Sequence, residues 1–220
     1  MSTFAEWAPA VAALALVAGP GLWRHSRHVI TIAHEAGHAL VALLTGRKLE
    51  GIKLNPDTSG VTVSRGRPTG IAVVLMYFAG YVTPSLLGLG AAALVIAEQV
   101  RPLLWATVVL LAGVLVMIRN VFGVLTVVLT GGAVFAVSWY ASEAWQAAFA
   151  LFVTWFLLLG GVRPVGELQR RRLRGRAPGS DADQLARITR VPGLVWVLLF
   201  AVVVVGALLL GGRMLLPVEV

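Results

Sequence analysis

Seven apolar runs along the chain have the composition of helices that cross a lipid bilayer. Such a helix needs about 17–25 residues. Of this chain, 58% is hydrophobic and only 13% is charged, about half the charged share of a soluble domain. We expect an all-α polytopic membrane protein with six to seven transmembrane helices, folded as one domain over residues 1–220. The predicted spans cover about residues 8–22, 29–46, 71–98, 103–118, 121–140, 144–161 and 193–212.

Two segments between these runs are too polar for a membrane interior. Residues 47–70 contain short β-branched alternations, "GIKL" and "GVTVS", on either side of Asn55-Pro56-Asp57. This pattern predicts a β-hairpin between the second and third spans. Residues 163–192 begin with the arginine-rich run "RPVGELQRRRLRGRAPG" and continue as "SDADQLARITRVPG". We expect a basic cytoplasmic loop there, with a helix that starts after Ser180 as its N-cap.

The net charge of +8 is unevenly distributed over the two sides of the predicted bundle. With a cytoplasmic amino terminus and seven complete crossings, 14 Lys and Arg residues lie on the cytoplasmic side and 4 on the other. The positive-inside rule favours this orientation. The run "RRRLRGR" also suits anionic lipid or nucleic acid, but a solvated loop that sets topology is the preferred interpretation. We therefore expect a multi-pass protein of the cell membrane, with the lipid bilayer and no nucleic acid among its partners.

The sequence "HEAGH" places His34, Glu35 and His38 inside the second predicted span. Residues four apart lie on one helical face, so both imidazoles can reach one tetrahedral Zn²⁺ at about 2.0–2.1 Å. Glu35 is poorly placed as a ligand, but it can reach a water molecule and act as a general base. A hydrogen-bonded polar cluster between helices is the alternative. Ionisable groups within a span are costly and mark functional sites, which favours the metal.

A catalytic zinc usually takes three protein ligands, and the chain has no cysteine to supply one. His25 and His28 fall between the first two predicted spans, where interfacial residues are expected. Asp57 lies in the predicted hairpin turn, where aspartate is common for backbone reasons. Asp181 and Asp183 open the helix before the last span, where acids also stabilise a helix start. Residues two apart lie about 200° apart around a helix, so only one of these two can face a metal.

Several segments together resemble the membrane-embedded zinc metallopeptidases related to the site-2 proteases, and more narrowly their small actinobacterial-type branch. These are "HEAGHALVALLTGRKL", the hairpin, "FAGYVTPSLLGLG", "RNVFG" and "SDADQLARITRVPGLVW". The resemblance implies that His34 and His38 bind zinc together with Asp181, which directly follows a serine, and that Glu35 is the catalytic base. Asp183 would then fold back on the helix cap. Well-studied site-2 proteases carry this aspartate in an Asp-Gly motif preceded by prolines, which "GSDADQL" lacks.

The activity that the resemblance implies is zinc-dependent hydrolysis of membrane-embedded protein or peptide substrates. The alternative is a non-proteolytic scaffold or permeation protein with a structural metal site, against which the intact Glu35 argues. The hairpin is either an edge for an extended substrate or a plug that shields the site from lipid. Asn120 in "RNVFG" either binds a substrate backbone or caps a helix. In "FAGYVTP", Gly80 and Pro84 are expected to be structural.

Overall fold

The computed structural model describes residues 3–175 and 177–216, and within them eight helices and one two-stranded sheet. The first elements are α1 (Thr3–Ala18), α2 (Pro20–Leu44), β1 (Lys48–Leu54) and β2 (Gly60–Arg65). They are followed by α3 (Ile71–Ile96), α4 (Val100–Met117), α5 (Val121–Tyr140), α6 (Glu143–Leu173), α7 (Asp181–Thr189) and α8 (Gly193–Leu215). Helices α3, α4, α5, α6 and α8 are long and apolar enough to cross a membrane, and Trp7–Ala18 is a shorter apolar helix. The predicted polytopic all-α fold with a hairpin between the second and third helices is confirmed.

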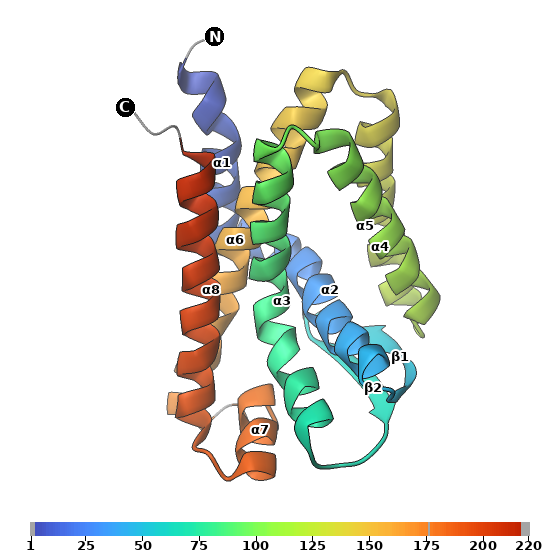
Figure 1. The fold of residues 1–220 in the computed structure, drawn as a ribbon, viewed down its shortest axis with the longest axis vertical. Helices are drawn as coiled ribbons and strands as arrows, with labels where there is room; N and C mark the ends of the chain where they lie inside the picture. The colour runs from blue at the N-terminus through green and yellow to red at the C-terminus, as the bar shows by residue number, and fades with distance from the viewer. Residues whose placement is uncertain (1–2, 176, 217–220) are drawn as a thin grey trace.

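Helix α3 packs closely against α6 and α8, while α4 and α5 form a pair that leans away from them (Figure 1). Small residues allow the close approach of α3 and α6. A Cβ atom on Gly161 would lie 2.1 Å from Ser85 Oγ, and one on Gly88 would lie 2.9 Å from the Leu158 amide nitrogen. In a membrane, where lipid is as apolar as leucine, such close packing is a main source of helix association. Pro84 is fully buried within α3.

A single non-helical residue, Gly19, joins α1 to α2. Pro20 occupies the first turn of α2, where its missing N–H removes no helical hydrogen bond, and the Trp23 amide donates to the Gly19 carbonyl at 2.8 Å. The break predicted between spans 8–22 and 29–46 is therefore wrong. Residues 23–28 are helical, and they place His25 and His28 on α2. The polar run there resembles a loop in sequence, but two of its side chains, Trp23 and Arg27, pair with Glu167 on α6 at 3.0 and 2.9 Å, while Arg24 and His25 are exposed.

The beginning of α1 and the end of α8 lie at the same end of the bundle, and α7 and the hairpin lie toward the other (Figure 1). Helix α2 continues obliquely from α1 toward the hairpin, so the two helices make one bent passage. The start of α1 and the basic end of α6 thus lie at opposite ends of the bundle, whereas the predicted topology places them on one side.

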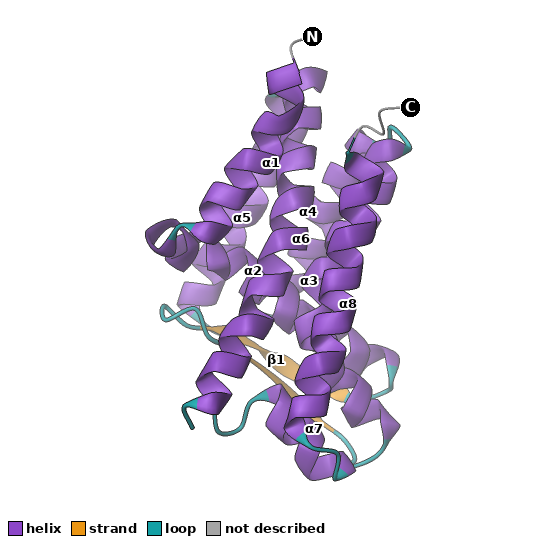
Figure 2. Ribbon diagram, turned by 90° about the vertical axis from the view of Figure 1, so that its left-hand side faces the viewer, coloured by secondary structure: helices purple, strands orange, loops and turns teal. Residues whose placement is uncertain are grey.

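The hairpin lies across the bundle near the end that carries α7 (Figure 2). Strands β1 and β2 pair antiparallel, with Ile52 opposite Thr62 and Leu54 opposite Gly60. In the turn, the Asp57 carboxylate accepts hydrogen bonds from the Ser59 amide at 2.9 Å and the Ser59 hydroxyl at 2.6 Å. These bonds hold the turn closed, as the aspartate at this position predicts.

The predicted basic loop is shorter than expected, because α6 continues to Leu173. Helix α7 begins at Asp181 directly after Ser180, as predicted. The Ser180 side chain makes no capping hydrogen bond; its backbone carbonyl accepts instead from the amides of Asp183 and Gln184 at 2.8 and 2.9 Å. Ser180 is therefore the N-cap by position, while its hydroxyl serves no capping role.

Candidate metal centre

Helix α2 presents His34 and His38 one turn apart, facing α3. Their Nε2 atoms lie 3.0 Å apart, and their rings meet edge to face. A glycine on α3 makes room for both rings: a Cβ atom on Gly80 would lie 2.4 Å from His38 Nε2 and 2.8 Å from His34 Cε1. On α2 itself, a Cβ atom on Gly37 would lie 2.3 Å from Thr83 Oγ1. The two glycines thus fix how closely the helices approach, which confirms the structural role predicted for Gly80.

Asp181, at the start of α7, completes a three-atom cluster with the histidines. Its Oδ2 atom lies 3.3 Å from His34 Nε2 and 3.3 Å from His38 Nε2. Ligand atoms bound tetrahedrally at about 2.0–2.1 Å are separated by about 3.3 Å, so these spacings fit one zinc ion. Within the described residues, His34, His38 and Asp181 form a group whose ligand atoms lie close enough together to hold one metal ion.

Neighbouring groups fix the orientation of the His38 ring and the charge of the Asp181 carboxylate. The His38 Nδ1 atom lies 2.7 Å from the Met76 carbonyl oxygen, so Nδ1 donates to that carbonyl and Nε2 is the ring atom that faces the cluster. Burial alone raises the pKa of the Asp181 carboxyl, but the imidazoles of His38 and His34 outweigh burial and hold that pKa below its usual range. The carboxylate is therefore the charged form that a metal ligand requires.

Asp183 does not face the cluster. Its carboxylate pairs with the Arg172 guanidinium on α6, and a Cβ atom on Gly193 at the start of α8 would lie 2.3 Å from the same guanidinium. Asp183 therefore joins α7 to the end of α6, and the predicted capping box with Ser180 is wrong. The opposite directions of Asp181 and Asp183 follow from their separation around the helix.

Glu35 lies on the neighbouring face of α2, beneath β2. Its side chain is buried, with the residue 3% exposed, and its Oε2 atom accepts a hydrogen bond from the Thr62 hydroxyl at 2.7 Å. A Cβ atom on Gly60 would lie 2.5 Å from Glu35 Oε1. A strand with glycine and threonine at these positions therefore covers the carboxylate. The alternation "GVTVS" predicts the strand, but no feature of the sequence predicts its contact with Glu35.

Asn120 precedes α5, and its side chain contacts the hairpin. Its amide nitrogen donates to the Leu54 carbonyl at 2.7 Å, and its Oδ1 accepts from the Leu54 amide at 3.1 Å. The Arg119 amide donates to the Ile52 carbonyl at 2.8 Å on the same edge of β1. Asn120 occupies the N-cap position of α5 without a side-chain capping bond. Its side chain thus binds the backbone of β1, a strand of the chain itself, and binding of a substrate backbone stays a prediction.

The other two histidines are separate from the cluster. The His28 ring packs against Phe122, with the ring centroids 5.3 Å apart. Two aromatic residues that the sequence did not single out do contact the site: the Tyr81 ring meets His34 edge to face at 4.8 Å, and the Tyr77 ring meets His38 at 6.3 Å. They occur one helical turn apart in "MYFAGYVTP" on α3, and this spacing is the signal that predicts a shared face.

Comparison with known proteins extends the resemblance to nearly the whole chain. The family model described as Peptidase M50B-like matches residues 7–211, a range that includes every residue of the cluster. No curated protein and no solved structure gave a match. The chain thus belongs to the Peptidase M50B-like family, the site-2 protease family of membrane metallopeptidases.

Proposed function

We propose that the protein is a zinc-dependent intramembrane endopeptidase that hydrolyses peptide bonds of membrane-embedded proteins or peptides. The convergence of His34 Nε2, His38 Nε2 and Asp181 Oδ2, separated by 3.0–3.3 Å, carries this proposal. Two imidazoles and one carboxylate form a ligand set typical of catalytic zinc, which keeps a fourth position open. Glu35, directly after the first ligand, supplies the acid–base group that a purely structural site does not need.

In this proposal, His34, His38 and Asp181 hold the metal and Glu35 moves the proton. When bound, zinc supplies the Lewis acidity that peptide hydrolysis requires. The Glu35 carboxylate accepts a proton from the attacking water while the water oxygen bonds to the scissile carbonyl carbon. Glu35 then returns that proton to the amide nitrogen as the C–N bond breaks, so the products are a carboxylate and an amine. A helical substrate must unwind locally, because its amides are otherwise engaged in its own hydrogen bonds.

The position of the hairpin supports the role of a cover over the site. Residues 118–120 occupy part of the outer edge of β1, so that part is not free to pair with a substrate strand. Strand β2 contacts Glu35 through Thr62 and Gly60. Water reaches the Glu35 carboxylate only after this contact loosens. In our proposal, substrate entry therefore includes a displacement of β2 away from α2.

We also propose that the metal-binding end of the bundle faces the cytoplasm in the cell membrane. That end carries most of the basic residues, among them Arg170, Arg171 and Arg172 at the end of α6, and the positive-inside rule assigns such an end to the cytoplasm. Because α1 begins at the other end (Figure 1), the amino terminus then lies on the opposite side of the membrane. This replaces the cytoplasmic amino terminus predicted from the sequence.

The experiment that tests the function compares wild-type protein with Glu35→Gln, both purified in lipid nanodiscs and expressed in cells. Both proteins should contain one zinc ion per chain by elemental analysis. Membrane proteomes should show cleaved fragments with wild-type protein and uncleaved precursors with Glu35→Gln. Bound zinc with identical membrane proteomes would favour the alternative function, a polytopic scaffold with a structural metal site. Absence of zinc from both proteins would contradict the metal centre itself.

A further inference from the structure

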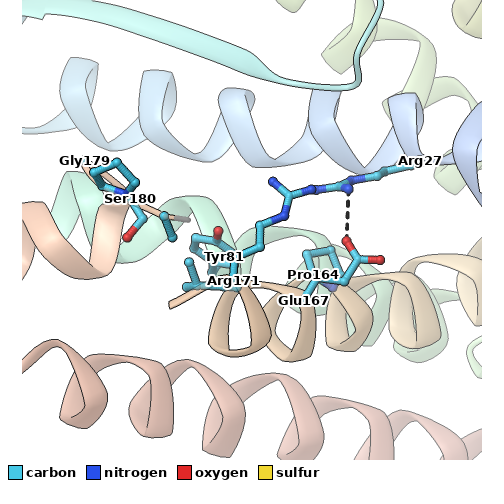
Figure 3. A pocket seen from close by; sticks show the side chains of 10 residues that line it. Arg27, Tyr81, Pro164, Glu167, Arg171, Gly179 and Ser180 are labelled. Atoms are coloured by element: carbon cyan, nitrogen blue, oxygen red, sulfur yellow. Dashed lines mark ion pairs between the residues drawn. The ribbon is translucent and has the colours of Figure 1, made fainter. Parts of the chain in front are cut away.

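An open cavity of about 300 Å³ lies beside the metal cluster, lined by α2, α3, α6 and the segment before α7 (Figure 3). We call it the arginine pocket, and the residues that matter here are Arg27, Tyr81, Glu167, Arg171 and Ser180. Two of these connect it to the cluster. The Tyr81 ring contacts His34, and Ser180 directly precedes Asp181. The pocket is therefore adjacent to the proposed reaction centre and is not part of it.

The position of Arg27 on α2 sets the distance of the pocket from the metal ligands. Arg27, Thr31, His34 and His38 follow one another at intervals of four, three and four residues, so they share one face of α2. The separation of seven positions between Arg27 and His34 corresponds to about 10 Å along a helix axis. An extended peptide advances about 3.3 Å per residue, so about three residues of substrate span this distance.

The charges that line the pocket leave it cationic. Arg27 lies 2.9 Å from Glu167 Oε2, yet Glu167 Oε2 has no aligned hydrogen-bond partner among the described residues. Glu167 Oε1 meanwhile accepts from the Trp23 indole and from Arg163, each at 3.0 Å. Glu167 is thus shared: Oε1 is held by Trp23 and Arg163, and Oε2 pairs with a single nitrogen of Arg27, whose guanidinium has five N–H donors. Arg27 remains able to donate to a ligand.

Arg171 lines the pocket from α6 and is exposed, and its guanidinium makes no hydrogen bond or ion pair within the described part of the chain. The positive charge of Arg171 also acts on the hairpin turn. Hydrogen bonds from Ser59 lower the pKa of the Asp57 carboxyl, and the charge of Arg171 lowers that pKa further. The Ser180 hydroxyl oxygen is buried and likewise has no hydrogen-bond partner among the described residues. Three groups that can donate hydrogen bonds to a ligand therefore line the same cavity. They are the Arg171 guanidinium, the remaining N–H groups of Arg27 and the Ser180 hydroxyl.

We propose that the arginine pocket binds a carboxylate of the peptide substrate through Arg27 and Arg171, about three residues from the scissile bond. This proposal rests on the proposed peptidase function and adds a substrate class to it. Guanidinium groups bind carboxylates through paired, charge-assisted hydrogen bonds, and the Ser180 hydroxyl supplies a third donor. The carboxylate comes either from an Asp or Glu side chain or from the carboxyl terminus of a short peptide. The second source would make the enzyme release short carboxyl-terminal fragments.

The test measures peptide binding rather than turnover. Glu35→Gln protein in phosphatidylcholine nanodiscs is loaded with zinc and titrated with fluorescein-labelled leucine heptapeptides, and binding is read from fluorescence anisotropy. One peptide has an amidated carboxyl terminus, a second has a free carboxylate, and two amidated series carry Asp or Asn at each position in turn. We expect a carboxylate peptide to bind about tenfold more tightly than its amide or Asn counterpart. A free terminus or one Asp position will identify the source.

Variants separate a binding role from a structural one. In the Glu35→Gln background, Arg27→Gln and Arg171→Gln should each remove most of the preference for the carboxylate. Glu167→Gln should increase the preference, because it removes the internal carboxylate next to Arg27 while the glutamine oxygen can still accept from Trp23. Matched controls are Arg24→Gln on α2 and Arg170→Gln on α6, both exposed and outside the pocket. These two should leave the preference unchanged.

The outcomes distinguish this proposal from the peptidase function. Equal binding of carboxylate and amide peptides, or no binding of any peptide, overturns the arginine pocket even where wild-type protein cleaves its substrates. A carboxylate preference that survives both Arg27→Gln and Arg171→Gln overturns it as well. A preference that depends on both arginines supports the pocket even if wild-type protein cleaves nothing, and in that case the peptidase function alone is contradicted.

Discussion

The hydroxyl of Thr62 donates a hydrogen bond to Glu35 Oε2 at 2.7 Å and so joins the middle of β2 to the proposed catalytic base. The same hydroxyl lies 3.1 Å from the Glu35 backbone carbonyl. A hydroxyl has a single proton to donate, and a bond to a charged carboxylate is the stronger of the two. The base is therefore engaged by the chain itself for as long as the hairpin rests on α2.

Thr62→Val should raise the rate of peptide cleavage by several-fold. Valine keeps the shape of the side chain but cannot donate to Glu35, and a hydrogen bond to a charged group contributes about 1.5–3 kcal/mol. Cleavage of a membrane peptide and amide hydrogen exchange in β2 should both become faster. Ser64→Ala on the same strand is the control, because the Ser64 hydroxyl contacts Arg47 and Met76 and makes no hydrogen bond to Glu35. A large fall in rate with unchanged exchange would mean that Thr62 orients the base instead.

Asp181→Ala should abolish stoichiometric zinc binding, because it removes one of three converging ligand atoms. Asp183→Asn should keep the zinc and lower the free energy of unfolding by about 0.5–1 kcal/mol, through loss of the partly exposed pair with Arg172. Zinc content by elemental analysis and thermal unfolding in detergent measure the two effects. Zinc that survives Asp181→Ala and disappears in Asp183→Asn would reverse the assignment of the ligand.

Gly80→Ala should weaken zinc binding at least tenfold. The added methyl group would meet the imidazoles of both His34 and His38 at distances no real contact reaches, and overpacking of this kind costs about 1–3 kcal/mol. Gly90→Ala on the same helix is the matched control, since nothing lies within 4 Å of its Cβ position. Competition with a zinc chelator provides the affinity. Equal affinities for the two variants would contradict the tight approach of α3 to the histidines.

Reporters fused to the two termini should lie on the same side of the membrane, and a reporter inserted near residue 175 should lie on the other side. The bent passage of α1 and α2, together with α3, α4, α5, α6 and α8, gives an even number of crossings. Paired alkaline phosphatase and fluorescent protein fusions measure the three positions. Termini on opposite sides would show that α1 and α2 each cross the membrane separately.

The sequence predicts the features of this site that depend on local spacing. The four-residue interval between His34 and His38 places both on one face of a helix, and the 200° between Asp181 and Asp183 leaves only one of them able to face the histidines. Both expectations agree with the geometry of the site. Only the resemblance to a family indicates Asp181 itself, because no local pattern relates a residue of α7 to one of α2.

Other features depend on the packing of distant segments and have no signal in the sequence. The run "RHSRH" has the composition of a loop, yet it is helical, and its Arg27 pairs with Glu167, a residue far along the chain. The contact of Thr62 with Glu35 and that of Asn120 with Leu54 likewise join segments that periodicity does not relate. Hydropathy identifies which segments are apolar, but it does not determine whether two consecutive helices turn back or continue in one direction.

The paired hydrogen bonds between Asn120 and Leu54 connect the start of α5 to Glu35, the proposed catalytic base, through the hairpin. Leu54 pairs with Gly60 across the hairpin, and Gly60 lies directly against Glu35. A shift of the first turn of α5 is thus transmitted through the Asn120 side chain and the Leu54–Gly60 strand pair to the strand above the carboxylate. A membrane helix that binds next to α5 and displaces it would move the hairpin as well. This movement would expose Glu35 without a contact to any metal ligand.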